Sequence, residues 1–136
     1  MTGFLRRSHA AKCVALLFAG SLALACGAPS DVTEVSQSEL SAALANGSAP
    51  LVLDARTPEE FAAGHVPGAV NIPHDTLEQR LGEIDVRRDR EIVVYCERGP
   101  RAARAEAVLT KAGFTAVRHL AGDMAAWRQA RLPVAK

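Results

Sequence analysis

The 136-residue sequence has no internal repeat, no low-complexity segment and no hydrophobic run long enough to span a bilayer. It also lacks an excess of one charge, because 16 lysines and arginines face 15 aspartates and glutamates. The length accommodates one domain and a short extra segment. These absences exclude a repeat array and a second domain. Nothing in the charge balance indicates a nucleic acid or a membrane surface as a partner.

Residues 1–25 have the features of a signal peptide. Their basic head consists of Arg6, Arg7 and Lys12. The uncharged apolar run that follows, Val14 to Ala25, is shorter than the roughly 20 residues of a membrane-spanning helix. Ala23-Leu24-Ala25 fits a cleavage site. Removing the three basic residues leaves 13 basic against 15 acidic residues, a net charge of −2. We therefore expect export to the periplasm or cell envelope.

Cys26 directly follows this segment and is a candidate for lipidation. Leu22 to Cys26 fits a permissive bacterial lipobox, although Ala23 stands where leucine is usual. In that interpretation Cys26 is the acylated first residue of the mature chain, and lipid anchors the protein to a membrane. Soluble export and an uncleaved anchor are the alternatives. Residues 26–31 form a small polar linker in each case.

Cysteine is scarce beyond this linker. Cys13 lies in the signal segment and Cys26 at its edge, so the predicted domain, residues 32–136, contains Cys96 alone. One cysteine cannot form a disulfide within the domain. A single thiol in an exported domain is either used for chemistry or inert.

Cys96 lies where α/β proteins place their ligands. Ile92 to Tyr95 is a short, β-branched apolar run, typical of a buried strand in a parallel sheet. Arg101 to Ala112 is an alanine-rich stretch that predicts a helix ending at Gly113. A thiolate between such a strand and helix faces backbone N–H groups and the positive end of the helix dipole. These surroundings favour a reactive thiolate.

Strands and helices alternate along the rest of the domain. Further strands are predicted at Thr33–Val35, Leu51–Asp54 and Val117–Leu120, with a brief one within 65–73. Further helices are predicted at Gln37–Ala45, after the capping box Thr57–Glu60, at Asp75–Glu83, and from the expected N-cap Asp123 to about Ala130. Residues 85–90 are a charged loop. The alternation predicts an α/β fold, with a parallel sheet and helices on both faces.

Several ordered motifs resemble those of the rhodanese family. The segment Cys96-Glu97-Arg98-Gly99-Pro100-Arg101 resembles the C-x-x-G-x-R active loop of rhodanese-type sulfurtransferases. Other matches are D-x-R at Asp54–Arg56, G-H-x-P-G-A-x-N-I-P at Gly64–Pro73, and L-x-G-G-x-x-x-W at Leu120–Trp127. Asp123 replaces the second glycine of the last motif. The resemblance covers 32–136 and implies the three-layer fold of an exported, single-domain bacterial rhodanese.

The resemblance implies a sulfurtransferase with Cys96 as the catalytic nucleophile. Sulfur would pass from thiosulfate or a persulfide donor to cyanide or a thiol, through a persulfide on Cys96. Glu97, Arg98, Gly99 and Arg101 are the expected substrate-binding residues, and no cofactor or metal is expected. Pro100 removes one N–H donor from the loop, and Glu97 opposes an anionic donor. Thiosulfate is therefore expected to be a poorer donor than a persulfide or polysulfide.

Three other functions stay open. A phosphatase or arsenate reductase of the same fold has a C-x5-R loop, one residue longer, but Ala102 stands at that arginine position. A non-catalytic rhodanese module that binds a partner usually lacks the cysteine that this chain has. An envelope persulfide carrier or thiol-redox protein would turn over little thiosulfate. The sequence does not identify the donor, the acceptor or the oligomeric state.

Several other polar or aromatic residues have simpler interpretations. Asp54 is expected to accept hydrogen bonds from loop backbone, and His65 is expected to be structural because it lies within a Pro-Gly turn motif. His74 and His119 lack the spacing of metal ligands. Trp127 and Phe61 are expected in the core, and the arginines at 87, 88 and 90 in a solvated loop.

Overall fold

A five-stranded sheet forms the centre of the computed structural model, which describes residues 32–136. The strands are β1 (Thr33–Val35), β2 (Leu51–Asp54), β3 (Val70–Asn71), β4 (Ile92–Tyr95) and β5 (Val117–Leu120). Their order is β1-β5-β4-β2-β3, and every neighbouring pair is parallel. The predicted α/β fold is confirmed. The predicted signal peptide, Cys26 and the linker lie outside the described residues.

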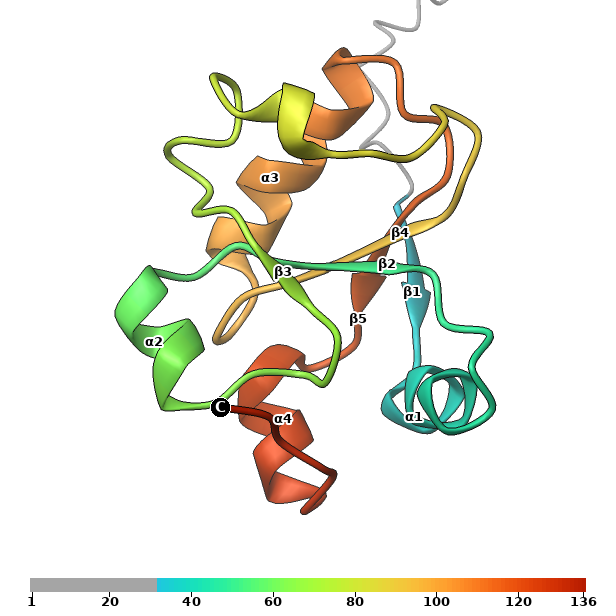
Figure 1. Ribbon diagram of the computed structural model, residues 1–136, viewed down its shortest axis with the longest axis vertical. Helices are drawn as coiled ribbons and strands as arrows, with labels where there is room; N and C mark the ends of the chain where they lie inside the picture. The colour runs from blue at the N-terminus through green and yellow to red at the C-terminus, as the bar shows by residue number, and fades with distance from the viewer. Residues whose placement is uncertain (1–31) are drawn as a thin grey trace, which may run out of the picture.

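Helices cover both faces of the sheet (Figure 1). They are α1 (Gln37–Ala45), α2 (Pro58–Ala63), α3 (Pro100–Lys111), α4 (Asp123–Gln129) and a 3-10 turn, η1 (Leu81–Glu83). Residues of α3 pack in one hydrophobic cluster, while residues of α1 and α4 pack in the other. Within the described part of the chain, no helix has the length and apolar character to cross a membrane.

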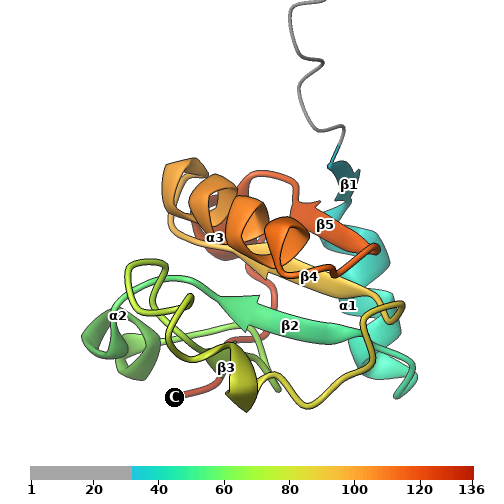
Figure 2. The ribbon, with the colours of Figure 1, turned by 90° about the horizontal axis from the view of Figure 1, so that it is seen from above.

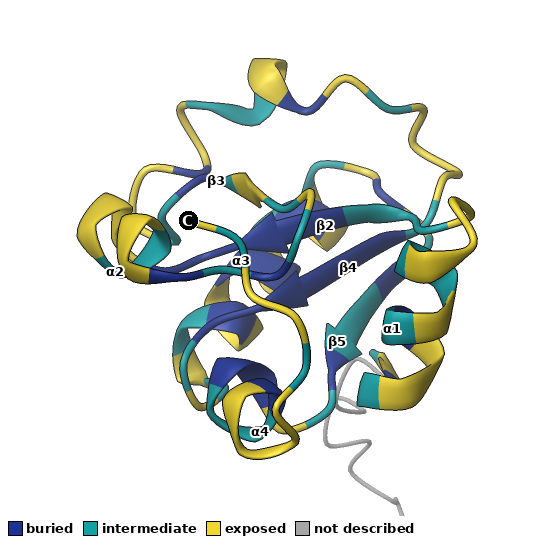
Figure 3. Ribbon diagram, turned by 60° about the horizontal axis from the view of Figure 1, so that its bottom comes forward, coloured by how far each residue is buried: buried dark blue, intermediate teal, exposed yellow. Residues whose placement is uncertain are grey.

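The central strand β4 is buried along its whole length (Figure 3). Ile92, Val94 and Cys96 belong to the cluster that contains α3. Val93 and Tyr95 belong to the cluster on the opposite face, as the alternation of side chains along a strand requires. Full burial of each such aliphatic side chain contributes about 1.5–3 kcal/mol. Because both faces of β4 are buried, its sequence is a continuous run of apolar residues.

Local capping signals set the starts of α1 and α2. The hydroxyl of Ser36 accepts the backbone N–H of Glu39 at 3.1 Å, which fixes the start of α1. Thr57 and Glu60 form the predicted reciprocal capping box around α2. Figure 2 shows α2 at the end toward which β2 points, the carboxyl edge of the sheet.

The predicted helix from Asp75 to Glu83 is wrong. The structure has turns there and only the 3-10 turn η1 at the end. Leu77 is the one fully buried residue of this segment, Leu81 is only partly buried against the same cluster, and Gly82 disfavours a helix.

Candidate active site

The structure places Cys96 immediately after β4, at the carboxyl edge of the sheet, where it is only 1% exposed. Its Sγ accepts a hydrogen bond from the backbone N–H of Gly99, with 3.0 Å between nitrogen and sulfur. Gly99 has a φ of 116°, in a region that favours glycine. The loop therefore uses glycine to turn an N–H group back toward the sulfur. This donor can stabilise a negative charge there.

The start of α4 holds both backbone groups of Cys96. Asp123 Oδ1 accepts the Cys96 N–H at 2.8 Å, and the N–H of Met124 donates to the Cys96 carbonyl at 3.0 Å. The N–H of Ala125 donates to the carbonyl of Glu97 at 3.1 Å. The loop is thus fixed by the helix that follows β5 as well as by α3.

Asp123 does not cap α4, and the prediction that it does is wrong. The N-cap is Gly122, and Asp123 is the first residue of the helix, with a φ of 56°. Aspartate is one of the few non-glycine residues that tolerate this left-handed conformation. Its carboxylate bonds the Cys96 amide instead of an N–H group of α4.

His119 lies between two carboxylates behind the loop. Its Nδ1 is 2.5 Å from Glu106 Oε1, and its Nε2 is 3.1 Å from Asp123 Oδ2. Hydrogen bonding to Asp123 and to Glu106 raises the pKa of His119 to about 10. Sequence reasoning considered His119 only as a metal ligand and so missed this arrangement. Aspartate in place of the family's second glycine was the one signal for it.

Arg101, in the first turn of α3, is paired with Glu60 of α2. The two terminal nitrogens lie 2.6 and 2.8 Å from the carboxylate oxygens. Hydrogen bonding to Arg101 lowers the pKa of Glu60 to about 2, so the carboxylate stays ionised. The pKa of Arg101 is raised by hydrogen bonding to Glu60 first, and also by interaction with the Cys96 sulfur. Sequence reasoning had assigned Glu60 only to the capping box.

Glu97 and Arg98 point to different surroundings. Glu97 is held by Arg128 at 2.6 Å, and its other oxygen lies 3.5 Å from Arg56. The carboxylate paired with Arg101 is Glu60, not Glu97. Arg98 is exposed, and among residues 32–136 its side chain has no ion-pair partner within 4.0 Å.

Asp54 and Arg56 form a buried ion pair beside the loop. Asp54 Oδ1 accepts the backbone N–H of Arg56 at 2.9 Å, which confirms the predicted bond to loop backbone. Asp54 Oδ2 accepts Nη2 of Arg56 at 2.7 Å and the hydroxyl of Tyr95 at 2.6 Å. Burial raises the pKa of Tyr95, so its hydroxyl remains a donor. The D-x-R motif thus holds β2, β4 and the Gly64 carbonyl together.

His65 has the structural role expected of it. Its ring stacks on Phe61, with 3.6 Å between ring centroids, and its Nδ1 lies 2.9 Å from the Phe61 carbonyl oxygen. Phe61 itself is only half-buried, on α2, and does not join the core as predicted.

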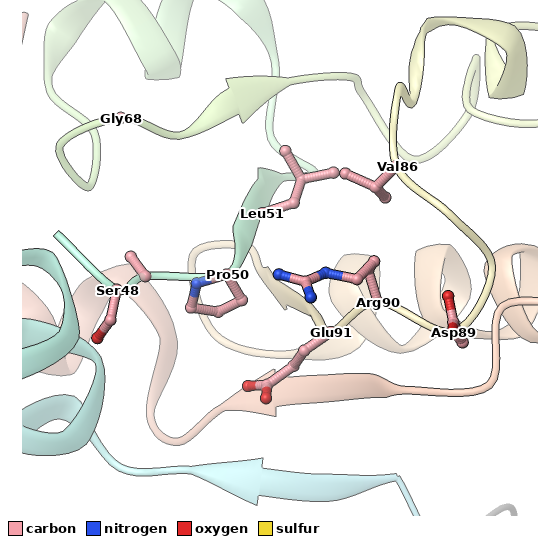
Figure 4. Close-up of a pocket in the computed structure, with 9 residues that line it drawn as sticks. Ser48, Pro50, Leu51, Gly68, Val86, Asp89, Arg90 and Glu91 are labelled. Atoms are coloured by element: carbon pink, nitrogen blue, oxygen red, sulfur yellow. The ribbon is translucent and has the colours of Figure 1, made fainter.

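A hollow of about 580 Å³ lies at the opposite edge of the sheet (Figure 4). It is lined at the amino ends of β2 and β4, where Leu51, Arg90 and Glu91 contribute side chains. The guanidinium of Arg90 points into this hollow (Figure 4). Parallel α/β sheets bind ligands at the carboxyl edge, and the thiol is there. We therefore place the candidate site at Cys96 and not in the hollow.

Comparisons with known proteins agree on one family. Residues 36–130 match the family described as "Rhodanese-like domain". A protein named "Sulfurtransferase" from Allochromatium vinosum is 37% identical over 103 residues, covering 76% of this chain and 94% of that protein. "Thiosulfate sulfurtransferase 16, chloroplastic" from Arabidopsis thaliana is 38% identical over 96 residues, covering 60% of this chain and 76% of that protein.

Solved structures share the fold. The crystal structure of the Alr3790 protein from Anabaena has a TM-score of 0.67 and 28% identity, covering 74% of this chain and 90% of that one. A rhodanese-related protein from Thermoplasma volcanium has a TM-score of 0.64 and 26% identity, and the match covers 76% of this chain and 97% of that one.

Proposed function

Because this chain belongs to the rhodanese-like domain family, we propose that it is a sulfurtransferase that carries sulfur as a persulfide on Cys96. The observation that carries the proposal is the hydrogen bond from the Gly99 N–H to Sγ, at the junction of β4 and α3. Relatives named as sulfurtransferases support sulfur transfer in general. The donor and the persulfide intermediate belong to the proposal.

The reaction has two displacement steps. The Cys96 thiolate attacks the outer sulfur of the donor, and the bond between the donor's two sulfur atoms breaks. Thiosulfate would release sulfite, and a persulfide donor would release a thiolate. A nucleophilic acceptor, cyanide or a thiol, then attacks the terminal sulfur of the Cys96 persulfide and regenerates the thiolate. The loop's N–H groups stabilise the anionic sulfur in both steps.

The charges around the site favour a persulfide donor over thiosulfate. Glu60 occupies both terminal nitrogens of Arg101, and Glu97 is paired with Arg128 and Arg56. A doubly charged donor must compete with these carboxylates for the arginines. The other arginine of the loop that such a donor could bind, Arg98, is exposed to solvent. A donor whose reacting end is a neutral or singly charged persulfide loses less from this competition.

A persulfide carrier with little thiosulfate turnover is the second candidate. The pairing of Arg101 with Glu60 favours it, because this pair leaves less positive charge to bind thiosulfate. A phosphatase or arsenate reductase is disfavoured by Ala102. This residue occupies the arginine position of the longer loop and is fully buried.

We also propose that the protein is exported, with Cys26 acylated and the domain held at the cell envelope. The motif at Leu22 to Cys26 and the basic head of the signal segment support this. Acylation at one residue with two or more chains gives stable anchoring.

Substitution of the nucleophile tests the function. Cys96→Ser should abolish sulfur transfer and preserve the fold, because serine nearly matches cysteine in volume and this loop supplies no base to activate a hydroxyl. Transfer above about one per cent of the wild-type rate would contradict a mechanism that relies on the thiolate.

A further inference from the structure

The side chains of Glu106, His119 and Asp123 form a continuous polar triad that ends at Cys96. They come from α3, β5 and α4, and they are 8, 16 and 3% exposed. The other carboxylate oxygen of Asp123, Oδ1, accepts a hydrogen bond from the Cys96 backbone N–H. Buried charged groups are costly unless they are paired, so three of them in contact must compensate one another.

When both carboxylates of the triad are ionised, its hydrogen bonds need a charged imidazole. Each ring nitrogen of His119 faces a carboxylate oxygen, and ionised carboxylates only accept hydrogen bonds. A neutral imidazole donates from one nitrogen alone, whereas an imidazolium donates from both. With His119 charged, the triad of Glu106, His119 and Asp123 has a net charge of −1. With His119 neutral, two buried carboxylates would be left uncompensated.

The Asp123 carboxylate bonds one residue of the loop that holds the sulfur and faces another. One oxygen accepts the Cys96 N–H, and the other lies 3.5 Å from the position that a Cβ on Gly99 would take. Gly99 is the residue whose N–H donates to Sγ. An uncompensated negative charge at Asp123 would therefore oppose the thiolate and the anionic persulfide.

We propose that His119 is a positioning residue for the Cys96 thiolate. Its positive charge holds the Asp123 carboxylate against the loop and offsets the negative charge that this carboxylate brings toward the sulfur. His119 thus acts on the sulfur through Asp123. The inference rests on the proposed function, in which the Cys96 thiolate is the nucleophile.

The pH dependence of Cys96 alkylation tests the proposal without requiring sulfur transfer. Iodoacetamide would be reacted with the purified mature protein, and the Cys96 peptide followed by mass spectrometry. His119→Gln should shift the midpoint of the rate profile up by about one pH unit and slow alkylation at pH 7 about tenfold. His74→Gln is the control, because within residues 32–136 the His74 side chain makes no hydrogen bond or ion pair with the triad or the loop. An unchanged profile for His119→Gln would overturn the proposal.

A double substitution separates charge compensation from simple structural support. Asp123→Asn keeps an oxygen to accept the Cys96 N–H and tolerates the left-handed backbone, but it removes the charge. In this background, His119→Gln should shift the alkylation midpoint by less than about 0.3 pH unit. A shift as large as in the wild-type background would refute compensation of Asp123. A wild-type protein that alkylates as expected but transfers no sulfur would count against the proposed function alone.

Nuclear magnetic resonance covers the case in which His119→Gln does not fold. The ring resonances of His119 in the unsubstituted protein should stay those of an imidazolium between about pH 5 and about pH 8.5. A titration of His119 near its ordinary range would overturn the proposal regardless of how the variants behave.

Discussion

The Glu60 carboxylate of α2 and the Arg101 guanidinium of α3 are joined by two hydrogen bonds, 2.6 and 2.8 Å long. The arginine that the family resemblance assigns to the substrate is thereby already paired. Glu60 stays ionised at physiological pH because its pKa is lowered to about 2, chiefly by hydrogen bonding to Arg101. We infer that this pair sets which sulfur donors the site accepts.

Glu60→Gln should improve thiosulfate as a donor. The amide keeps an oxygen for the capping bond to Thr57 N–H and removes the charge that competes for Arg101. We expect kcat/KM for thiosulfate to rise about tenfold, roughly 1.4 kcal/mol, and to change much less for a persulfide donor. Glu59→Gln, on the same exposed turn, is the matched control. Equal effects on both donors would show that Glu60 does not select between them.

Arg101→Ala should lower kcat/KM for an anionic donor by about tenfold to a hundredfold, roughly 1.4–2.8 kcal/mol. The substitution removes a charge that interacts with the sulfur and leaves Glu60 without its arginine partner. The pH midpoint of Cys96 alkylation should also rise. Arg104→Ala is the control, since Arg104 is exposed and one turn further along α3. Similar kinetics for the two variants would mean that Arg101 is not a site residue.

Stability should fall at alkaline pH because of His119. Its pKa is raised from 6.5 to about 10 by hydrogen bonding to Asp123 and Glu106, so the folded state retains a proton that the unfolded state releases. This contribution is fully present below pH 6.5 and is lost as pH rises through about 10. The free energy of unfolding should decline by at most about 1.4 kcal/mol per pH unit from this group. Urea denaturation should show a flatter profile for His119→Gln, and parallel profiles for the two proteins would contradict the assignment.

The proposed lipid anchor predicts how the expressed protein partitions. The mature wild-type protein should enter the detergent phase almost completely, because acylation with two or more chains gives stable anchoring. Cys26→Ala should remain an unprocessed precursor or become soluble. Recovery of wild-type protein from the soluble periplasmic fraction, with an unmodified Cys26 at its N-terminus, would indicate plain export instead.

Elements whose signals are local were predictable from the sequence. The run Ile92 to Tyr95 defines β4 because both faces of the strand are buried. The hydroxyl of Ser36 fixes the start of α1 by accepting the N–H of Glu39, three residues away. The position of Cys96 at the edge of the sheet follows from β4 and α3 together. The helix predicted over 75–83 did not form, because the segment buries only Leu77 fully and contains Gly82.

The charge pairs of the site were not predictable, because the fold brings together residues far apart in the sequence. Glu60 and Arg101 are 41 residues apart, and Cys96 and Asp123 are 27 apart. The sequence also offers a local role for each acidic residue: Glu60 completes a capping box, and Asp123 was predicted to be a helix N-cap. For Asp123 the local explanation was wrong, since a positive φ turns its carboxylate toward the loop.

Mass spectrometry of the purified protein after treatment with a sulfur donor tests the persulfide on Cys96 most directly. A polysulfide or small-molecule persulfide should add about 32 Da to the Cys96 peptide of the wild-type protein, the mass of one sulfur atom. Cyanide or a thiol should then remove the added mass, and Cys96→Ser should never acquire it. A wild-type Cys96 that alkylates readily but gains no sulfur from any of these donors would contradict the proposed function.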